Sequence, residues 1–400
     1  MIRSARQLVT LRGPQGPRRG LAMGELAIIS DGALLLRDGL IQEVGPTRRV
    51  ENLAAARGAI EIDATGKVVM PGFVDCHTHL MFPQPQSGEG VFDIDIDRAA
   101  YRLETVTAQR LAGRGRVWLQ AMARHGTTTL EAKTGCGPNE SAELKVLRVL
   151  NVLNKGALDI VPTFLFRLGT RTEDGQRADA AAAEMVFHDL MFKIRRRRLS
   201  HFADLQWDTD MARRPLLIRF LDAALSLGFA CKIHADQHSC GGAVSLAVEY
   251  GATSIDHLEY ATLEQARILA GTPTIATLLP CASFRHGHHA PARTLIEAGV
   301  PVALGTNFNP CHTPSLNMQT AISLASLQLE MSPAEAITAA TINAAHALKI
   351  AGRVGSLECD KLADVLILAT PDHRDLGYQL GTNLVHTTIK RGEILCALRN

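Results

Sequence analysis

The stretch Pro71-Gly-Phe-Val-Asp-Cys-His-Thr-His-Leu80 is a short apolar segment that ends in two histidines. His77 and His79 are two residues apart at the end of a predicted strand, so their side chains leave the strand on the same side. Two imidazoles on one side of a strand can share a metal ion. Since barrel enzymes gather their catalytic residues at the C-terminal ends of parallel strands, this stretch predicts a barrel if other strands end in the same way.

Two further predicted strands also end in histidines. Lys232-Ile-His234 closes the fifth strand candidate, and Ser254-Ile-Asp-His257 closes the sixth. One histidine after a strand is more often a packed or capping residue than a ligand, but four of them at the ends of three strands favour a shared metal site. A divalent ion held by imidazoles lowers the pKa of water from about 16 to about 7, so the pattern indicates hydrolysis. Asp256 should point to the opposite side of its strand from His257, so we do not expect it to be a ligand.

The middle of the chain has the period of parallel β/α units. Short runs rich in Val, Ile and Thr alternate there with longer segments rich in Ala, Leu, Arg and Glu. A Gly-x-Gly-x-x-Gly after a strand, a Walker loop and a Gly-x-Ser-x-Gly elbow are all absent, which disfavours an open doubly wound sheet. We therefore predict an α/β fold with a closed (β/α)₈ TIM barrel. Its eight strand candidates are Gly72–Cys76, Thr127–Ala132, Ile160–Leu165, Phe202–Trp207, Ala230–Ile233, Ser254–Asp256, Thr274–Leu278 and Val302–Leu304.

The two ends of the chain have a different sequence pattern. Short apolar runs broken by Asp31-Gly32 and Asp38-Gly39 predict β-hairpins before the barrel. Similar runs return after Val354, where Lys390-Arg391-Gly392 predicts a tight turn between two strands. We expect both ends to meet in one sheet.

Composition restricts the class of protein. Of 400 residues, 46% are apolar and 20% are charged, which excludes a disordered chain and a coiled coil. The net charge is +2, so bulk charge does not steer the chain to nucleic acid or to a membrane, and a small-molecule partner is expected. Four consecutive arginines, Arg195 to Arg198, favour a solvated helix end over a phosphate site. A barrel of this size commonly pairs through exposed helices, so a homodimer is one expected assembly.

The eight cysteines contain no Cys-x-x-Cys pair, which argues against a zinc knuckle or a small disulfide scaffold. The basic N-terminus has no apolar core of a signal peptide, and no run of about 18 apolar residues occurs. We therefore expect a cytoplasmic protein with reduced thiols.

The motifs together resemble the amidohydrolase superfamily and, within it, the imidazolonepropionase family, which opens a cyclic imidazolone by attack of metal-activated water. The resemblance implies a (β/α)₈ barrel with a small β-sandwich formed from both chain ends. We accordingly expect residues 1–66 and 351–400 to form the sandwich and residues 67–350 to form the barrel. The matching segments are Pro71–Leu80, Gly126–Lys133, Lys232–Leu258, Ala276–Pro310, Ala334–Ala347 and Gly355–Ile394.

The resemblance also implies roles for the histidines. His77, His79 and His234 would bind one zinc or iron ion, and His257 would hydrogen-bond the attacking water or the carbonyl oxygen.

Two carboxylates of the family pattern are amides in this chain. The eighth strand of the family ends in an Asp that contacts the metal and takes a proton from water, and Asn307 stands there in Leu304-Gly-Thr-Asn-Phe-Asn-Pro310. In His234-Ala-Asp-Gln237, Gln237 replaces a Glu that is expected to move a proton during ring opening. An amide preserves the shape of the carboxylate but cannot accept a proton at neutral pH, and it binds hard cations more weakly.

The substrate-binding loops depart from the family as well. Met81-Phe-Pro-Gln-Pro-Gln-Ser-Gly-Glu89 lacks the Arg that would grip a substrate carboxylate, and Cys136 replaces a Tyr after the second strand. The family pattern has a histidine after the third strand. The corresponding position in this chain falls near Leu168, where no histidine stands. These changes disfavour imidazolonepropionate itself as the substrate. Cys136 and His312, which follows the eighth strand, remain candidate substrate-binding residues.

Three hypotheses follow from this pattern. The first is a metal-dependent hydrolase acting on a cyclic amide, amidine or related C–N bond, with His257 as the base and Asn307 as a neutral ligand or hydrogen-bond donor. The second is a pseudoenzyme that binds a ligand in the same cavity without catalysis. The third is a metal-free cyclase or tautomerase that uses imidazole groups alone.

Overall fold

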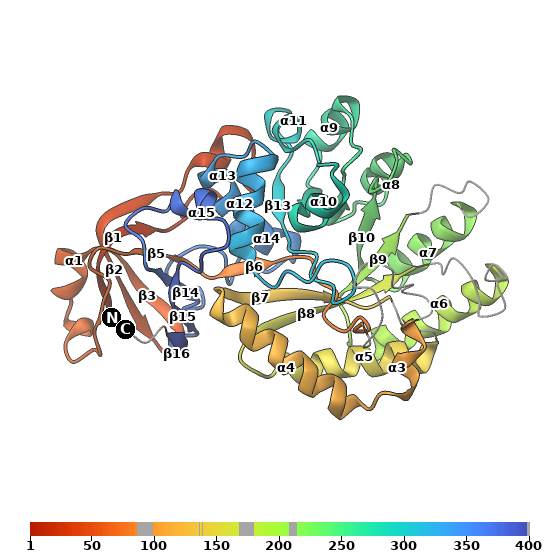
Figure 1. Ribbon diagram of the computed structural model, residues 1–400, viewed down its shortest axis with the longest axis horizontal. Helices are drawn as coiled ribbons and strands as arrows, with labels where there is room; N and C mark the ends of the chain where they lie inside the picture. The colour runs from red at the N-terminus through yellow and green to blue at the C-terminus, as the bar shows by residue number, and fades with distance from the viewer. Residues whose placement is uncertain (86–98, 136, 138, 168–179, 208–213, 398–400) are drawn as a thin grey trace.

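Two β-sheets organise the computed structural model, which describes residues 1–85, 99–135, 137, 139–167, 180–207 and 214–397. One sheet is the barrel, and the other, the terminal sheet, is an open sheet of eight strands beside it, at the left of Figure 1. The barrel strands are β6 (Phe73–Asp75), β7 (Thr127–Lys133), β8 (Asp159–Phe166), β9 (Phe202–Gln206), β10 (Ala230–Ala235), β11 (Ser254–His257), β12 (Ile275–Leu278) and β13 (Val302–Leu304).

The eight barrel strands pair in chain order, and every pair is parallel. The segments after β13 and β6 close the ring, because Thr78 forms a parallel bridge with Phe308 and the Asn307 N–H donates to the His77 carbonyl at 3.0 Å. This arrangement confirms the predicted α/β barrel. All eight strand candidates are strands, and each end lies within two residues of its prediction because the strands are short apolar runs between polar turns.

Helices cover the outside of the barrel (Figure 1). Their first turns carry sequence-encoded caps: Ser332 and Glu335 form a capping box at the start of α13, as Thr262 and Gln265 do at the start of α9. The α-helices are α1 (Thr47–Glu51), α3 (Arg102–Thr105), α4 (Ala108–Arg124), α5 (Glu140–Leu153), α6 (Ala180–Arg196), α7 (Arg214–Ser226), α8 (Ala243–Glu249), α9 (Leu263–Ala270), α10 (Pro280–His286), α11 (Ala292–Glu297), α12 (Met318–Gln328), α13 (Pro333–Ala339), α14 (Ile342–Ala347) and α15 (Asp375–Tyr378), and the short 3₁₀ helices are η1 (Gly20–Gly24) and η2 (Ala54–Ala56).

The terminal sheet joins both ends of the chain, as expected. Its strand order is β16-β15-β14-β5-β1-β2-β3, with β4 paired to β1. β5 is the last strand of this sheet before the chain enters the barrel; the division into residues 1–66, 67–350 and 351–400 stays a proposal. The strands are β1 (Ile2–Val9), β2 (Ile28–Arg37), β3 (Leu40–Pro46), β4 (Ile62–Asp63), β5 (Val68–Pro71), β14 (Val365–Leu368), β15 (Val385–Lys390) and β16 (Glu393–Ala397).

Of the turn signals, Asp38-Gly39 and Arg391-Gly392 form the tight turns that were predicted, with positive φ at both residues of each pair. The prediction of a turn at Asp31-Gly32 is wrong, because β2 continues through it. A Cβ on Gly32 would lie 2.4 Å from that of Leu8 on β1. The glycine is therefore needed for close packing of two strands and does not reverse the chain.

Candidate metal centre

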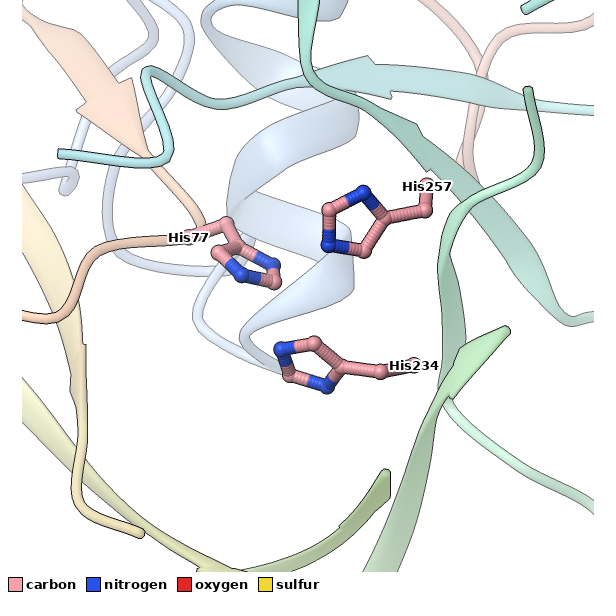
Figure 2. A group of neighbouring side chains, drawn as sticks. All are labelled: His77, His234 and His257. Atoms are coloured by element: carbon pink, nitrogen blue, oxygen red, sulfur yellow. The ribbon is translucent and has the colours of Figure 1, made fainter. Parts of the chain in front are cut away.

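Four buried histidines gather at the C-terminal ends of the barrel strands. His77 and His79 follow β6, His234 lies near the end of β10, and His257 ends β11. The ring centroids of His77 and His234 are 4.5 Å apart, and His257 lies 5.7 Å from His77 and 5.6 Å from His234. Figure 2 shows these three rings pointing toward one another from different strands.

Ligand atoms of His77, His234 and His257 all lie within 4.8 Å of one another. His79 joins this group through His77, since the two Nε2 atoms are 3.3 Å apart. The set of ligands implied by the sequence was His77, His79 and His234, with His257 beside the water. The structure brings all four histidines together, and the assignment of three as ligands stays a proposal.

Three of the four rings are held by carboxylates through Nδ1. His77 Nδ1 lies 2.8 Å from Asp256, His234 Nδ1 lies 3.1 Å from Asp204, and His257 Nδ1 lies 3.3 Å from Glu259. A carboxylate on Nδ1 requires the proton there, so Nε2 presents its lone pair to the centre of the group.

Burial keeps two of the imidazoles neutral. It lowers the pKa of His77 and of His79 well below the usual value, and the nearby Lys133 ammonium acts in the same direction. Neutral imidazole is the form that binds a metal ion.

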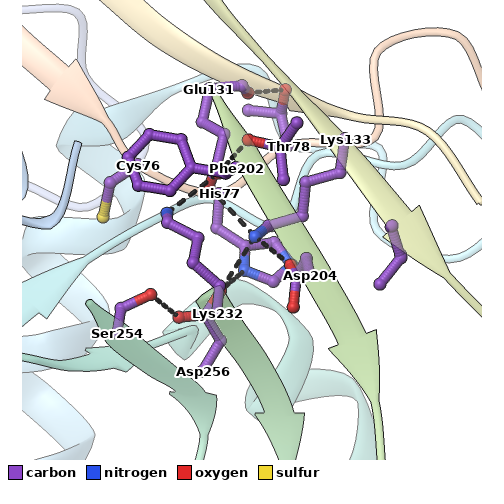
Figure 3. Close-up of polar contacts among 12 residues, drawn as sticks. Cys76, His77, Thr78, Glu131, Lys133, Phe202, Asp204, Lys232, Ser254 and Asp256 are labelled. Carbon is purple, nitrogen blue, oxygen red and sulfur yellow. Dashed lines mark hydrogen bonds and ion pairs between the residues drawn. The ribbon is translucent and has the colours of Figure 1, made fainter. Parts of the chain in front are cut away.

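A buried ionic network lies beneath the histidines (Figure 3). The Lys133 ammonium contacts Asp204 at 2.5 Å, Asp256 at 3.0 Å and Glu131 at 3.1 Å, and Lys232 contacts Glu131 at 2.8 Å. All five side chains are fully buried. Three carboxylates thus face two ammonium groups, which leaves an excess of one formal negative charge below the histidines.

This pairing fixes the charge states around Lys133. Burial opposes a charged ammonium, but Asp204, Asp256 and Glu131 outweigh it and hold the pKa of Lys133 well above its usual value. Burial likewise opposes ionised Asp256, but Lys133 and the hydrogen bond from His77 hold its pKa well below the usual value. Asp204, His234 and Asp256 also offer ligand atoms within 4.8 Å of one another, yet the Lys133 ammonium already lies between the two carboxylates. A single cation among the histidines is therefore the arrangement that these charges favour.

Sequence reasoning missed this network, although the strands contain its signal. Along β7 the polar residues Thr129, Glu131 and Lys133 alternate with apolar ones, and in a strand buried on both faces the polar set must line the barrel interior. Asp256 obeys the same rule and shares the inner face with Ser254, whose hydroxyl donates to it at 2.7 Å. His257 should then face outward, but its φ of +85° ends the extended geometry and turns the chain, and its ring meets those of His77 and His234.

Asn307 lies beside His77 in the segment after β13. Its N–H donates to the His77 carbonyl, its φ is +53°, and its side chain is 8% exposed. Thr306 anchors this segment by donating from its N–H at 3.0 Å and from its hydroxyl at 2.6 Å to Asp75. Burial raises the pKa of Asp75 to about 7, against these two hydrogen bonds. The Asn307 Oδ1 is buried without a hydrogen-bond partner among the described residues.

The other predicted site residues are less closely tied to the histidines. Gln237 is half-buried in the loop after β10, and in the described part of the chain no hydrogen bond joins its side chain to them. His312 is half-buried in the segment after β13. Cys136 lies outside the described residues.

The chemistry of the donor set fits a divalent cation. His234 Nε2 and Asn307 Oδ1 are buried polar atoms without a partner among the described residues, and a metal ion would satisfy such atoms. Neutral imidazoles and one amide oxygen are suitable ligands, and the acidic network below offsets positive charge.

Comparison with known proteins places this site in a family. The model of the amidohydrolase family matches residues 222–395. Over 99% of its length the chain is 39% identical to an imidazolonepropionase from Symbiobacterium thermophilum, of which it covers 96%, and 38% identical to one from Chloroflexus aggregans, of which it covers 98%. The chain belongs to the amidohydrolase family.

Solved structures show the same fold. A triazine hydrolase variant has a TM-score of 0.78 at 15% identity, with 99% of this chain and 94% of that chain covered. An adenosine deaminase from Xanthomonas campestris with bound zinc has a TM-score of 0.71 at 17% identity, with 98% and 92% covered.

Membership of the amidohydrolase family indicates a hydrolase that acts on C–N bonds other than peptide bonds, with a divalent metal ion and a small-molecule substrate. Among the described residues, none of the helices has the length and apolar character needed to cross a membrane.

Proposed function

We propose that this amidohydrolase uses one zinc or iron ion to hydrolyse a C–N bond in a cyclic amide or amidine that resembles an imidazolone. The curated relatives named imidazolonepropionase support the ring chemistry. The missing arginine in residues 81–89, and Cys136 in place of a tyrosine, support a substrate other than imidazolonepropionate itself.

This proposal rests on one observation: four buried histidines lie together at the C-terminal ends of the barrel strands. We assign His77, His79 and His234 as the metal ligands, since the Nε2 atoms of His77 and His79 lie 3.3 Å apart and the buried Nε2 of His234 has no partner among the described residues. When bound, a divalent cation acts as a Lewis acid that makes water a stronger nucleophile at neutral pH.

His257 is the proposed base. Its Nδ1 is held by Glu259, which in turn accepts from the Ser283 hydroxyl at 3.0 Å, so Nε2 is left to take a proton from the attacking water. Burial opposes ionised Glu259, but its contact with His257 and the hydrogen bond from Ser283 hold the pKa of that carboxyl below its usual value. An ionised Glu259 would stabilise the imidazolium that His257 becomes.

Asn307 and Gln237 are the proposed neutral members of the site. The Asn307 carbonyl oxygen would face the cation or a donor on the substrate, and Gln237 would orient the substrate without moving a proton.

The two amides also support an alternative, a ligand-binding pseudoenzyme or a metal-free cyclase or tautomerase. Metal content separates these functions from the hydrolase. We expect close to one zinc or iron ion per chain by elemental analysis of the purified protein, and loss of that ion in His77→Ala. Protein that binds no zinc, iron or manganese after incubation would exclude the metal-dependent hydrolase.

Activity is tested on a panel of imidazolones and related cyclic amides. We expect hydrolysis by the native chain, and a roughly 100-fold increase in kcat when Asn307→Asp and Gln237→Glu restore two proton-accepting groups. Catalysis that is absent from both proteins, while both hold one metal ion, would favour the pseudoenzyme.

A further inference from the structure

A cavity lies at the opposite end of the barrel from the histidines. It has a volume of about 650 Å³, and the first residues of β8, β9 and β10 line it. The histidines stand at the other ends of the strands, so this hollow is separate from the proposed active site. A volume of this size suits a molecule as large as a nucleotide.

Cationic side chains from three separate segments line this cavity. Arg195 and Arg198 come from the end of α6 and the turn after it, and Lys349 and Arg353 come from the chain after α14. Arg391, from the turn between β15 and β16, completes the group.

Acidic groups do not balance these charges. Asp159 is the one carboxylate among the lining residues in the described ranges, and it is paired with Lys390 at 2.9 Å and with Arg391. No ion pair of the described part of the chain involves the other four cations, although Arg195 lies over the Phe229 ring at 5.8 Å.

A favourable interaction with a helix C-terminus accounts for basic residues near the end of α6 and near the end of α14, each taken alone. It does not account for both sets lining one hollow without a carboxylate partner among the described residues. Like charges gathered in one concave site repel one another, and a multiply charged anion would relieve that repulsion. Guanidinium groups match phosphate oxygens in a bidentate geometry, which favours phosphate among anions.

We propose that this cavity binds a small, multiply phosphorylated compound. The bound anion would lie against Arg195, Arg198, Lys349 and Arg353, far from the histidines. The proposal is independent of the hydrolytic function.

Isothermal titration of the full chain with fructose 1,6-bisphosphate at low salt tests this site. We expect saturable binding of one molecule per chain that weakens as NaCl is added. The variant R195Q/R198Q should bind about tenfold more weakly or worse, because both of its changed residues line the cavity. R196Q/R197Q is the matched control, since it removes the same charge from the same arginine run but neither residue lines the cavity.

K349Q/R353Q provides a second test from a different segment and should show a similar loss. Thermal melting of each variant verifies that it is folded. Equal weakening by R195Q/R198Q and R196Q/R197Q would show attraction to a basic helix end only, and would overturn the proposal. Absence of saturable binding to the native chain at low salt would overturn it as well.

Discussion

Carboxylates below the histidines determine which ring nitrogen faces the centre of the site. Asp256 and Asp204 hold Nδ1 of His77 and His234, and both also contact the Lys133 ammonium. One lysine thereby connects histidines that come from β6 and β10. Zinc or iron affinity should depend on these buried groups even though they are not proposed ligands.

Replacing the carboxylate behind His77 should weaken metal binding. Asp256→Asn removes the charge that favours a proton on Nδ1, so His77 becomes a poorer and less ordered ligand. We expect zinc affinity to fall about 10- to 100-fold, measured by competition with a chelator. Asp222→Asn is the control, because Asp222 is exposed and, among the described residues, accepts from the Tyr250 hydroxyl at 2.8 Å. Equal affinities in the two variants would refute an orienting role for Asp256.

Removing the buried ammonium should destabilise the whole barrel. Lys133→Met leaves Glu131, Asp204 and Asp256 without their shared cation, at an expected cost of about 3–5 kcal/mol in the free energy of unfolding. Lys193→Met makes the same change at an exposed pair with Glu140 and should cost about 1 kcal/mol or less. Urea denaturation at pH 7 measures both values. A cost below that of the control would show that Lys133 does not hold the network together.

At the level of secondary structure, the periodicity of apolar residues predicted elements better than turn-forming dipeptides such as Asp-Gly did. All eight barrel strands could be found because each is a short run, largely buried on both faces, between longer helical segments. Asp31-Gly32 was misassigned because the same dipeptide suits a hairpin turn and a close approach of two strands, and only the position of Leu8 decides between them. Strand β1, which carries Leu8, was not among the predicted strands.

The four histidines could be predicted because each ends a recognisable strand, whereas their supporting groups depend on contacts across the barrel. Lys133 meets Asp204 and Asp256 from strands far apart in sequence, and local motifs do not encode which charges will pair. The position of His257 depends on its positive φ, which a non-glycine residue rarely adopts and which alternation along a strand does not predict.

The hydrogen bonds in the first turn of α13 predict how the stability of the fold changes with pH. Glu335 accepts from the Ser332 N–H at 2.8 Å and from Arg293 at 2.7 Å. Burial raises the pKa of Glu335, but these hydrogen bonds outweigh burial and hold it below the usual 4.5. A lowered pKa stabilises the fold above pH 4.5, and this contribution is lost as the pH falls through the folded-state value.

Glu335→Gln should therefore cost about 1 kcal/mol at pH 7, and the difference from the native chain should shrink below pH 4.5. Urea denaturation at pH 7 and at several values below 4.5 measures it. Glu297→Gln is the control, since Glu297 is 71% exposed and pairs with the same Arg293 at 3.5 Å. A cost for Glu335→Gln that does not change with pH would contradict the assignment of an ionised cap.

The whole molecule is joined by buried polar contacts between segments far apart in the chain. The Asn343 amide donates to the Val302 carbonyl at 2.8 Å and to the Arg18 carbonyl at 3.0 Å, and its oxygen accepts from the Arg18 N–H at 2.7 Å. Asn343 is fully buried on α14, so one side chain ties the N-terminal segment to the last barrel strand. Between the terminal sheet and α4, the Thr388 hydroxyl donates to the Ala123 carbonyl at 2.7 Å. We expect the sheet and the barrel to unfold as one cooperative unit.

Asn343→Leu tests that coupling, because leucine fills nearly the same volume but cannot satisfy the backbone groups that Asn343 bonds. Buried groups without partners cost about 1–3 kcal/mol each, so the variant should lose several kcal/mol of stability. Asn52→Leu is the control: Asn52 is exposed and, within the described ranges, its side chain donates to the Arg48 carbonyl, so its loss should cost less than about 1 kcal/mol. Urea denaturation followed by circular dichroism and by tryptophan fluorescence gives the readout; both tryptophans, Trp118 on α4 and Trp207 after β9, report on the barrel.

Coincident transitions at a lower urea concentration would show that the N-terminal segment and the barrel share one stability. A fluorescence transition that stays at the native midpoint, while circular dichroism changes earlier, would show instead that the barrel folds without the contacts that Asn343 makes.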